Sequence, residues 1–174
     1  CTVVGVCGKK EDVANIQDLL IYTIKGISQI VKKGNLDIKE LGKLNHEMLT
    51  SLFMTITNAN FDKERFFAKI KEALKLRDEL KNTLVEKNVE LGELADAATF
   101  TVNSNDEIVF KSVSDKVSIL ATENEDVRSL RELIIYGLKG MAAYAEHAGN
   151  LGHVDAEISK FIRKALAATL DGSL

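Results

Sequence analysis

Apolar residues recur at three- and four-residue steps along most of the chain, which is the spacing of one face of an α-helix. Between Asp12 and Lys33 this face consists of Val13, Ile16, Leu19, Leu20, Thr23, Ile24, Ile27 and Val31. Gly34 follows at once, and glycine readily adopts the backbone conformation that ends a helix. The pattern therefore predicts a long amphipathic helix over this stretch.

Two more amphipathic helices are predicted after short connections. The second begins at Asp37, whose carboxylate can cap its first turn, and runs to Phe53. The third begins near Asp62 and continues toward Leu84. Proline, which interrupts helices, is absent from all 174 residues. Three helices with short connections predict an antiparallel three-helix bundle over residues 11–90.

The same pattern returns 114 positions later without a gap. Identical residues at matching positions include the pairs Asp12 and Asp126, Leu19 and Leu133, Tyr22 and Tyr136, and Gly26 and Gly140. We therefore expect an all-α protein of two tandem three-helix bundles related by an internal repeat. The two mid-helix glycines indicate close helix packing, and the two tyrosines are interpreted as interface residues.

The second copy, residues 121–174, lacks its third helix, because Asn60 corresponds to Leu174. Two amphipathic helices alone expose an apolar stripe, so a homodimer or a helix-swapped assembly is predicted to cover it. Residues 91–120 connect the copies. Within them the turn-prone run from Asn103 to Asp106 lies between β-favouring residues and predicts a small β-hairpin or extended arm.

Charge and hydropathy exclude several classes of protein. The net charge is -3 and lysines are scattered among acids, so no basic stripe predicts nucleic-acid binding. No apolar run approaches the roughly 18 residues of a membrane span, and no signal peptide is recognised. A soluble, cytoplasmic protein with no membrane partner is expected. The first residue is cysteine, so we expect a fragment, a processed form or part of a longer chain.

The two cysteines, Cys1 and Cys7, stand in a glycine-containing loop over residues 1–10 that leads into the first helix. A thiolate is anionic, so the helix N-terminus and the nearby Lys9 and Lys10 favour it electrostatically. Spacing alone leaves two readings open: half of an iron–sulfur site, or two unrelated, partly buried thiols.

The repeat provides an internal comparison for these cysteines. The corresponding positions in the second copy hold Asp115 and Ala121, so the start of the bundle can be built without cysteine. A chemical role for Cys1 and Cys7 is therefore favoured. A cubane cluster takes about four ligands, and the remaining ligands would have to come from upstream residues or from another chain.

The histidines His46, His147 and His153 are interpreted as solvent-facing or helix-capping residues. A ferritin-like di-iron site would need a glutamate three positions before each histidine, and Lys43, Tyr144 and Asn150 stand there instead. No catalytic residue is predicted from the sequence.

Several segments resemble the N-terminal region of hybrid cluster proteins, the hydroxylamine reductase or prismane family. The likeness covers nearly the whole chain and is most specific between Ile119 and His147. The segments that carry it are Cys-Thr-Val-Val-Gly-Val-Cys-Gly-Lys at 1–9 and the stretches 16–22, 57–62, 119–133 and 137–147.

The resemblance implies a longer protein, in which a helical domain of two three-helix bundles precedes two α/β domains that hold a hybrid iron–sulfur–oxygen cluster. The family is described as reducing hydroxylamine to ammonia, with nitric oxide also proposed as substrate. Electrons are thought to enter through a cluster bound by four N-terminal cysteines. Cys1 and Cys7 match the last two of these, with the spacing of members that carry a 4Fe-4S cubane.

By this resemblance the chain is expected to be inactive alone and to carry part of the 4Fe-4S site. The electron donor leaves no trace in the sequence. The alternative reading is a non-catalytic helical interaction or dimerisation module whose cysteines are incidental.

Overall fold

The computed structural model describes residues 4–36 and 41–172, and within these ranges the regular structure is helical, apart from one isolated β-bridge. The all-α prediction is confirmed. The long helices are α1 (Glu11–Gly34), α2 (Gly42–Met54), α3 (Lys63–Glu86), α6 (Glu125–Asn150) and α7 (Ala156–Ala168). The short helices are α4 (Asp96–Thr99), α5 (Asn105–Ser112) and a 3₁₀ turn (Ile119–Ala121). No helix of the described residues is long and apolar enough to cross a membrane.

Side-chain caps fix where the later helices begin. Asp62, Asn124 and Asp155 each accept hydrogen bonds from two backbone amides in the first turn of α3, α6 and α7. The predicted start of the third helix at Asp62 is thereby confirmed. The predicted cap at Asp37 lies outside the described residues, and α2 begins at Gly42.

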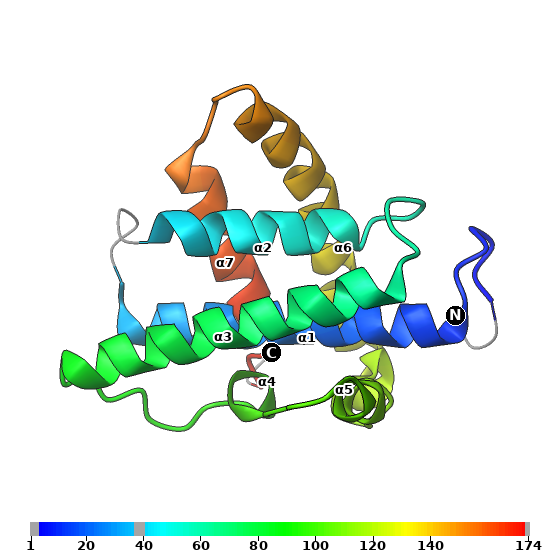
Figure 1. Cartoon of the computed structure of the whole chain (residues 1–174). Helices are drawn as coiled ribbons and strands as arrows, with labels where there is room; N and C mark the ends of the chain where they lie inside the picture. Colours follow the sequence, from blue (N-terminus) through cyan, green and yellow to red (C-terminus); the bar gives the residue numbers. More distant parts are fainter. Residues whose placement is uncertain (1–3, 37–40, 173–174) are drawn as a thin grey trace.

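The 114-residue repeat is visible in the helix bounds. α6 begins 114 residues after α1, and both ends of α7 lie 114 residues after those of α2. Each of these four helices packs mainly on a helix of the other copy. α1 packs on α7, and α2 packs on α6. Figure 1 shows α6 and α7 crossing the direction of α1 and α2.

All four of these helices contribute to one apolar core. Its buried members include Ile24, Ile27, Leu44, Leu52, Ile135, Leu138, Ile162 and Leu166. Helices α6 and α7 therefore complete the core of the first copy instead of forming a bundle of their own. The predicted division into two tandem bundles is not confirmed by this arrangement.

The opposite face of α1 is covered by α3 and by the segment between the copies. Ile16, Leu19 and Leu20 of α1 pack there against Phe66 and Ile70 of α3, and all five side chains are at most 1% exposed. Helix α1 is thus enclosed from several sides, and it is the central element of the fold.

The predicted β-hairpin between the copies is wrong, because the residues concerned form α4 and α5. The Ser104 hydroxyl accepts a hydrogen bond from the Glu107 amide at 3.1 Å, and the Glu107 carboxylate accepts one from the Asn103 amide at 2.8 Å. The polar run read as a hairpin turn is therefore the N-terminal cap of α5. Ile108, one turn into the helix, is fully buried against α1.

The two repeated glycines have different surroundings. A Cβ at Gly26 would lie 2.0 Å from the carbonyl oxygen of Ala97, so close packing of α4 on α1 requires glycine there. A Cβ at Gly140 would meet no described atom within 4 Å. The packing prediction is confirmed for Gly26 and is not met for Gly140.

One face of α6 is apolar and exposed. Leu130, Leu133 and Tyr144 are 61%, 65% and 82% exposed, whereas their counterparts on α1 are at most 1% exposed. These counterparts are Ile16, Leu19 and Ile30. The counterpart of α3 would begin at position 177, so no helix of the described residues covers this face. The predicted apolar stripe on the second copy is therefore present.

Candidate functional site

The loop before α1 is a tight turn closed by backbone hydrogen bonds. Val4 and Lys10 form an antiparallel bridge, and the Gly5 amide donates to the Lys9 carbonyl at 2.8 Å. The Gly8 amide donates to the Gly5 carbonyl at 2.8 Å, with Gly8 at a φ of +85°, where a side chain would be strained. Cys7, which precedes this glycine, is a free, partly exposed thiol.

Positive groups surround the loop. The Lys9 side chain is only 4% exposed, and its Nζ lies 5.1 Å from the centre of the Phe61 ring. Burial lowers the pKa of Lys9, and the charge of Cys7 opposes this by raising it. Lys10 occupies the N-cap position of α1, and its side chain does not cap the helix. Backbone amides of the first turn therefore lie next to the loop without a cap from Lys10. The loop can therefore hold an anionic sulfur ligand.

The loop does not form a complete metal site. Cys1 lies outside the described residues, so the structure does not test its distance from Cys7. Among residues 4–36 and 41–172, no three His, Cys, Asp or Glu side chains gather in a group that could hold a metal ion. The whole sequence contains two cysteines, whereas a cubane takes about four ligands. The chain supplies half of such a ligand set at most.

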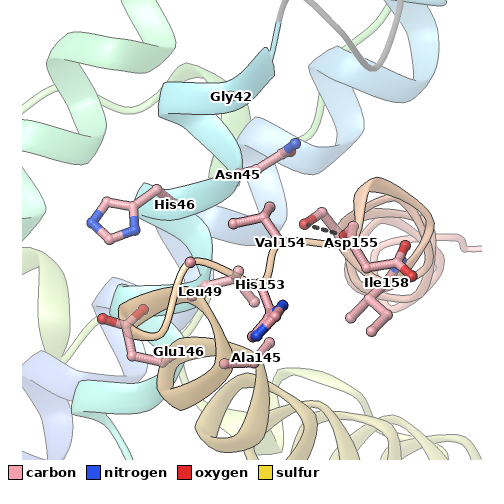
Figure 2. Close-up of a pocket in the computed structure, with 14 residues that line it drawn as sticks. Gly42, Asn45, His46, Leu49, Ala145, Glu146, His153, Val154, Asp155 and Ile158 are labelled. Atoms are coloured by element: carbon pink, nitrogen blue, oxygen red, sulfur yellow. Dashed lines mark hydrogen bonds between the residues drawn. The ribbon is translucent and has the colours of Figure 1, made fainter.

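The histidines do not add ligands to this loop. His46 and His153 line a separate pocket of about 600 Å³ between α2 and the turn joining α6 to α7. Figure 2 shows their rings pointing in different directions across that pocket. The His147 ring packs edge-on against Phe53, with ring centres 5.5 Å apart. All three histidines are exposed, in agreement with their interpretation as solvent-facing residues.

A cluster of four charged residues between α1 and α6 was not anticipated from the sequence. Asp18, Lys25, Glu132 and Lys139 line a cavity of about 50 Å³. Burial raises the pKa of Asp18 to about 6, although the Lys139 charge opposes this, and burial lowers the pKa of both lysines. The available signal was the repeat, which pairs Asp18 with Glu132 and Lys25 with Lys139.

The two repeated tyrosines also differ. The Tyr22 hydroxyl donates to Asp96 Oδ2 at 2.9 Å, and Asp96 accepts further hydrogen bonds from Lys111 at 2.6 Å and Lys116 at 3.1 Å. Burial, followed by the Asp96 hydrogen bond, raises the pKa of Tyr22. Tyr22 thus joins α1 to α4, as an interface residue, while Tyr136 is 78% exposed.

Comparison with known proteins shows the family of the chain. The sequence profile of the Prismane/CO dehydrogenase family matches residues 1–174, which is the whole chain. The chain belongs to this family. Proteins of the prismane family carry iron–sulfur clusters.

The similar proteins are named hydroxylamine reductases. The one from Acetivibrio thermocellus is 58% identical over 174 residues, covering 100% of this chain and 31% of the relative. Those from Caldanaerobacter subterraneus subsp. tengcongensis and Desulfitobacterium hafniense are 52% and 54% identical, covering 100% of this chain and 32% of each relative. The chain spans about a third of the length of these relatives and matches their N-terminal part.

Proposed function

We propose that this chain is the N-terminal helical part of an oxidoreductase that reduces hydroxylamine to ammonia, and that it carries part of the 4Fe-4S site through which electrons enter. The observation that carries the proposal is the free, partly exposed Cys7 in a glycine turn at the start of α1. The match of the whole chain to hydroxylamine reductases supports the reaction class.

The contribution of the chain's own residues follows from the loop geometry. A bound 4Fe-4S cluster supplies one-electron transfer. Cys7, with Cys1, would provide two thiolate ligands, and the turn closed by Gly5 and Gly8 fixes the direction of the Cys7 side chain. The positive end of α1 and the Lys9 ammonium would stabilise the negative charge of thiolate and cluster. The other two ligands lie outside these 174 residues in this proposal.

The reaction itself is assigned to the remaining two-thirds of the parent protein. The chain has no catalytic residue of its own in this proposal, so it is inactive alone. The small nitrogen substrate and the hybrid iron–sulfur–oxygen cluster would bind in domains that the chain does not include. We place the parent protein in the cytoplasm, where reducing conditions keep cysteine thiols available as ligands.

Iron and acid-labile sulfide analysis of the anaerobically purified parent protein tests the ligand assignment. We expect Cys1→Ala and Cys7→Ala each to lose the iron, sulfide and visible absorption of the cubane. His153→Ala is the matched control, because this exposed residue lies outside the loop, and it should retain them. Both cysteine variants retaining a full cubane would show that the assignment is wrong.

The second candidate function is a non-catalytic helical module that binds another protein chain. The exposed apolar face of α6 favours it, since monomeric proteins rarely leave such a face uncovered. In this case Cys1 and Cys7 are incidental, and the iron content of the parent protein would not change in either variant.

For the 174-residue chain on its own, we propose a homodimer in which the α6 faces of two copies cover each other. Light scattering at micromolar concentration is expected to give twice the 19.2 kDa chain mass. Leu133→Lys should return the mass to that of a monomer without unfolding the chain, because this side chain is 65% exposed. A clean monomer mass for the unaltered chain would contradict the proposal.

A further inference from the structure

A polar pocket lies where the segment before α6 meets α1 and the residues after α7. Its volume is about 320 Å³. Four basic side chains line it against a single acidic one, Glu132. The basic residues are Lys25, Lys116, Arg128 and Arg131. Such an excess of positive charge in a concave site favours an anionic ligand.

The guanidinium of Arg131 is held in place by both neighbouring segments. Its Nη1 donates to Thr122 Oγ1 at 3.0 Å and its Nη2 to the Asp171 carbonyl at 2.6 Å. The Nε atom is inaccessible to solvent and has no hydrogen-bond partner among the described residues. A buried N–H group normally has a hydrogen-bond acceptor, and a water or an ion can supply one where no protein atom does.

Two further cations border the same space. Arg128 Nη1 donates to the Thr122 carbonyl at 3.0 Å, which fixes a second guanidinium beside that of Arg131. Lys25 forms no hydrogen bond or ion pair within the described part of the chain, although it is partly buried. Burial lowers the pKa of Lys25, the charges of Glu132 and Asp18 oppose this, and Arg131 adds to the lowering. A bound anion would relieve the repulsion between these cations.

The repeat shows that the fold does not require this charge. The positions 114 residues before Arg128 and Arg131 hold Ala14 and Gln17, and both helices form. Gln17 is buried, and its Nε2 donates to the Thr55 carbonyl at 3.3 Å, so a neutral amide fills the equivalent position. The segment 115–121 that borders the pocket corresponds to the cysteine segment 1–7. Arg128 and Arg131 are therefore particular to the second copy of the repeat, whereas Lys25 is matched by Lys139.

A purely structural role accounts for only part of this arrangement. Arg131 does join Thr122 to the end of α7, which stabilises the packing of α6. This role does not explain the unpaired Lys25, the second guanidinium or the open volume between them. We infer that the pocket binds a small oxyanion, a phosphate group held by Arg128 and Arg131 with Lys25. Planar guanidinium groups match the geometry of phosphate oxygens well.

Titration of the 174-residue chain with inorganic phosphate, at constant ionic strength and pH 7, tests the inference. Isothermal calorimetry is expected to show saturable binding of one phosphate per chain. Arg131→Gln, which copies the residue at position 17, should weaken binding at least tenfold, and so should Arg128→Ala. Lys160→Ala is an exposed control whose ion pair, among the described residues, is with Glu157, and it should bind as the unaltered chain does.

Two further measurements complete the test. Circular dichroism melts check that each variant is folded, and phosphate should raise the melting temperature of the unaltered chain but not that of Arg131→Gln. Repeating the titration with adenosine monophosphate distinguishes a nucleotide ligand from free phosphate. Tighter binding than that of phosphate indicates a nucleotide, and equal binding indicates free phosphate. Binding that does not saturate, or that is equal in Arg131→Gln and the unaltered chain, would overturn the inference.

Discussion

Gly26→Ala is expected to lower the free energy of unfolding by about 3 kcal/mol or more. The new methyl group would lie 2.0 Å from the Ala97 carbonyl oxygen and 2.6 Å from the Ala98 nitrogen. Both are backbone atoms of α4, so no side-chain rotation can relieve the overlap, and α4 must move away from α1. Urea unfolding followed by far-UV circular dichroism measures the change.

Gly140→Ala is the matched control at the repeated position. In the monomeric chain no described atom lies within 4 Å of the added methyl group, so alanine there should stabilise α6 by up to about 1 kcal/mol through helix propensity. Unchanged stability in Gly26→Ala would contradict the packing of α4 on α1. A loss of stability in Gly140→Ala, seen only at concentrations where the proposed homodimer forms, would agree with a second copy covering this face of α6.

Arg77→Ala is expected to cost about 3 kcal/mol of unfolding free energy. Arg77 is 1% exposed, and its Nη1 donates to the Phe100 carbonyl at 2.6 Å. Its guanidinium carbon lies 5.6 Å from the centre of the Phe100 ring, and Nη2 contacts Asp78 at 2.8 Å. Alanine would leave the Phe100 carbonyl without this donor and remove the packing between α3 and the segment after α4.

Lys75→Ala is the control for this experiment, on the same helix. Its side chain is 78% exposed and its ammonium is 4.0 Å from Glu79, so the change should be within about 0.5 kcal/mol. Thermal or urea unfolding of both variants provides the comparison. Equal stability of Arg77→Ala and Lys75→Ala would show that Arg77 does not hold these segments together.

The long helices could be predicted from the sequence because each combines an apolar stripe with a local end signal. α1 ends at Gly34 as predicted, although the left-handed conformation that ends it belongs to the next residue, Asn35, at a φ of +45°. α3 has Asp62 at its start. α5 was missed because it has only eight residues and its cap consists of residues that also favour turns. Periodicity over so short a segment cannot separate a helix from a strand.

The partner exchange between the copies could not be predicted from periodicity. An apolar stripe specifies which face of a helix is buried, but it does not specify which helix covers that face. By the apolar pattern alone, Ile24 of α1 could pack against helices of the first copy or of the second. The structure shows that the core containing Ile24 also includes Ile162 of α7.

The candidate site was only partly predictable for a similar reason. The sequence pointed to the loop because it holds two cysteines where the second copy has Asp115 and Ala121. The structure adds the turn that presents Cys7. The charged cavity around Asp18 and the basic pocket around Arg131 depend on contacts between α1 and α6. Beyond the repeat, which pairs Asp18 with Glu132, such contacts between distant segments leave no pattern in the sequence.

The proposal that Cys7 is a cluster ligand is the central one, and electron paramagnetic resonance of the reduced parent protein tests it most directly. Serine at this position keeps the size of the side chain but replaces the sulfur ligand by oxygen. The Cys7→Ser variant is therefore predicted to lose the signal of the reduced 4Fe-4S cluster or to show it with altered g values. A cluster signal identical to that of the unaltered protein, at full intensity, would contradict the proposal.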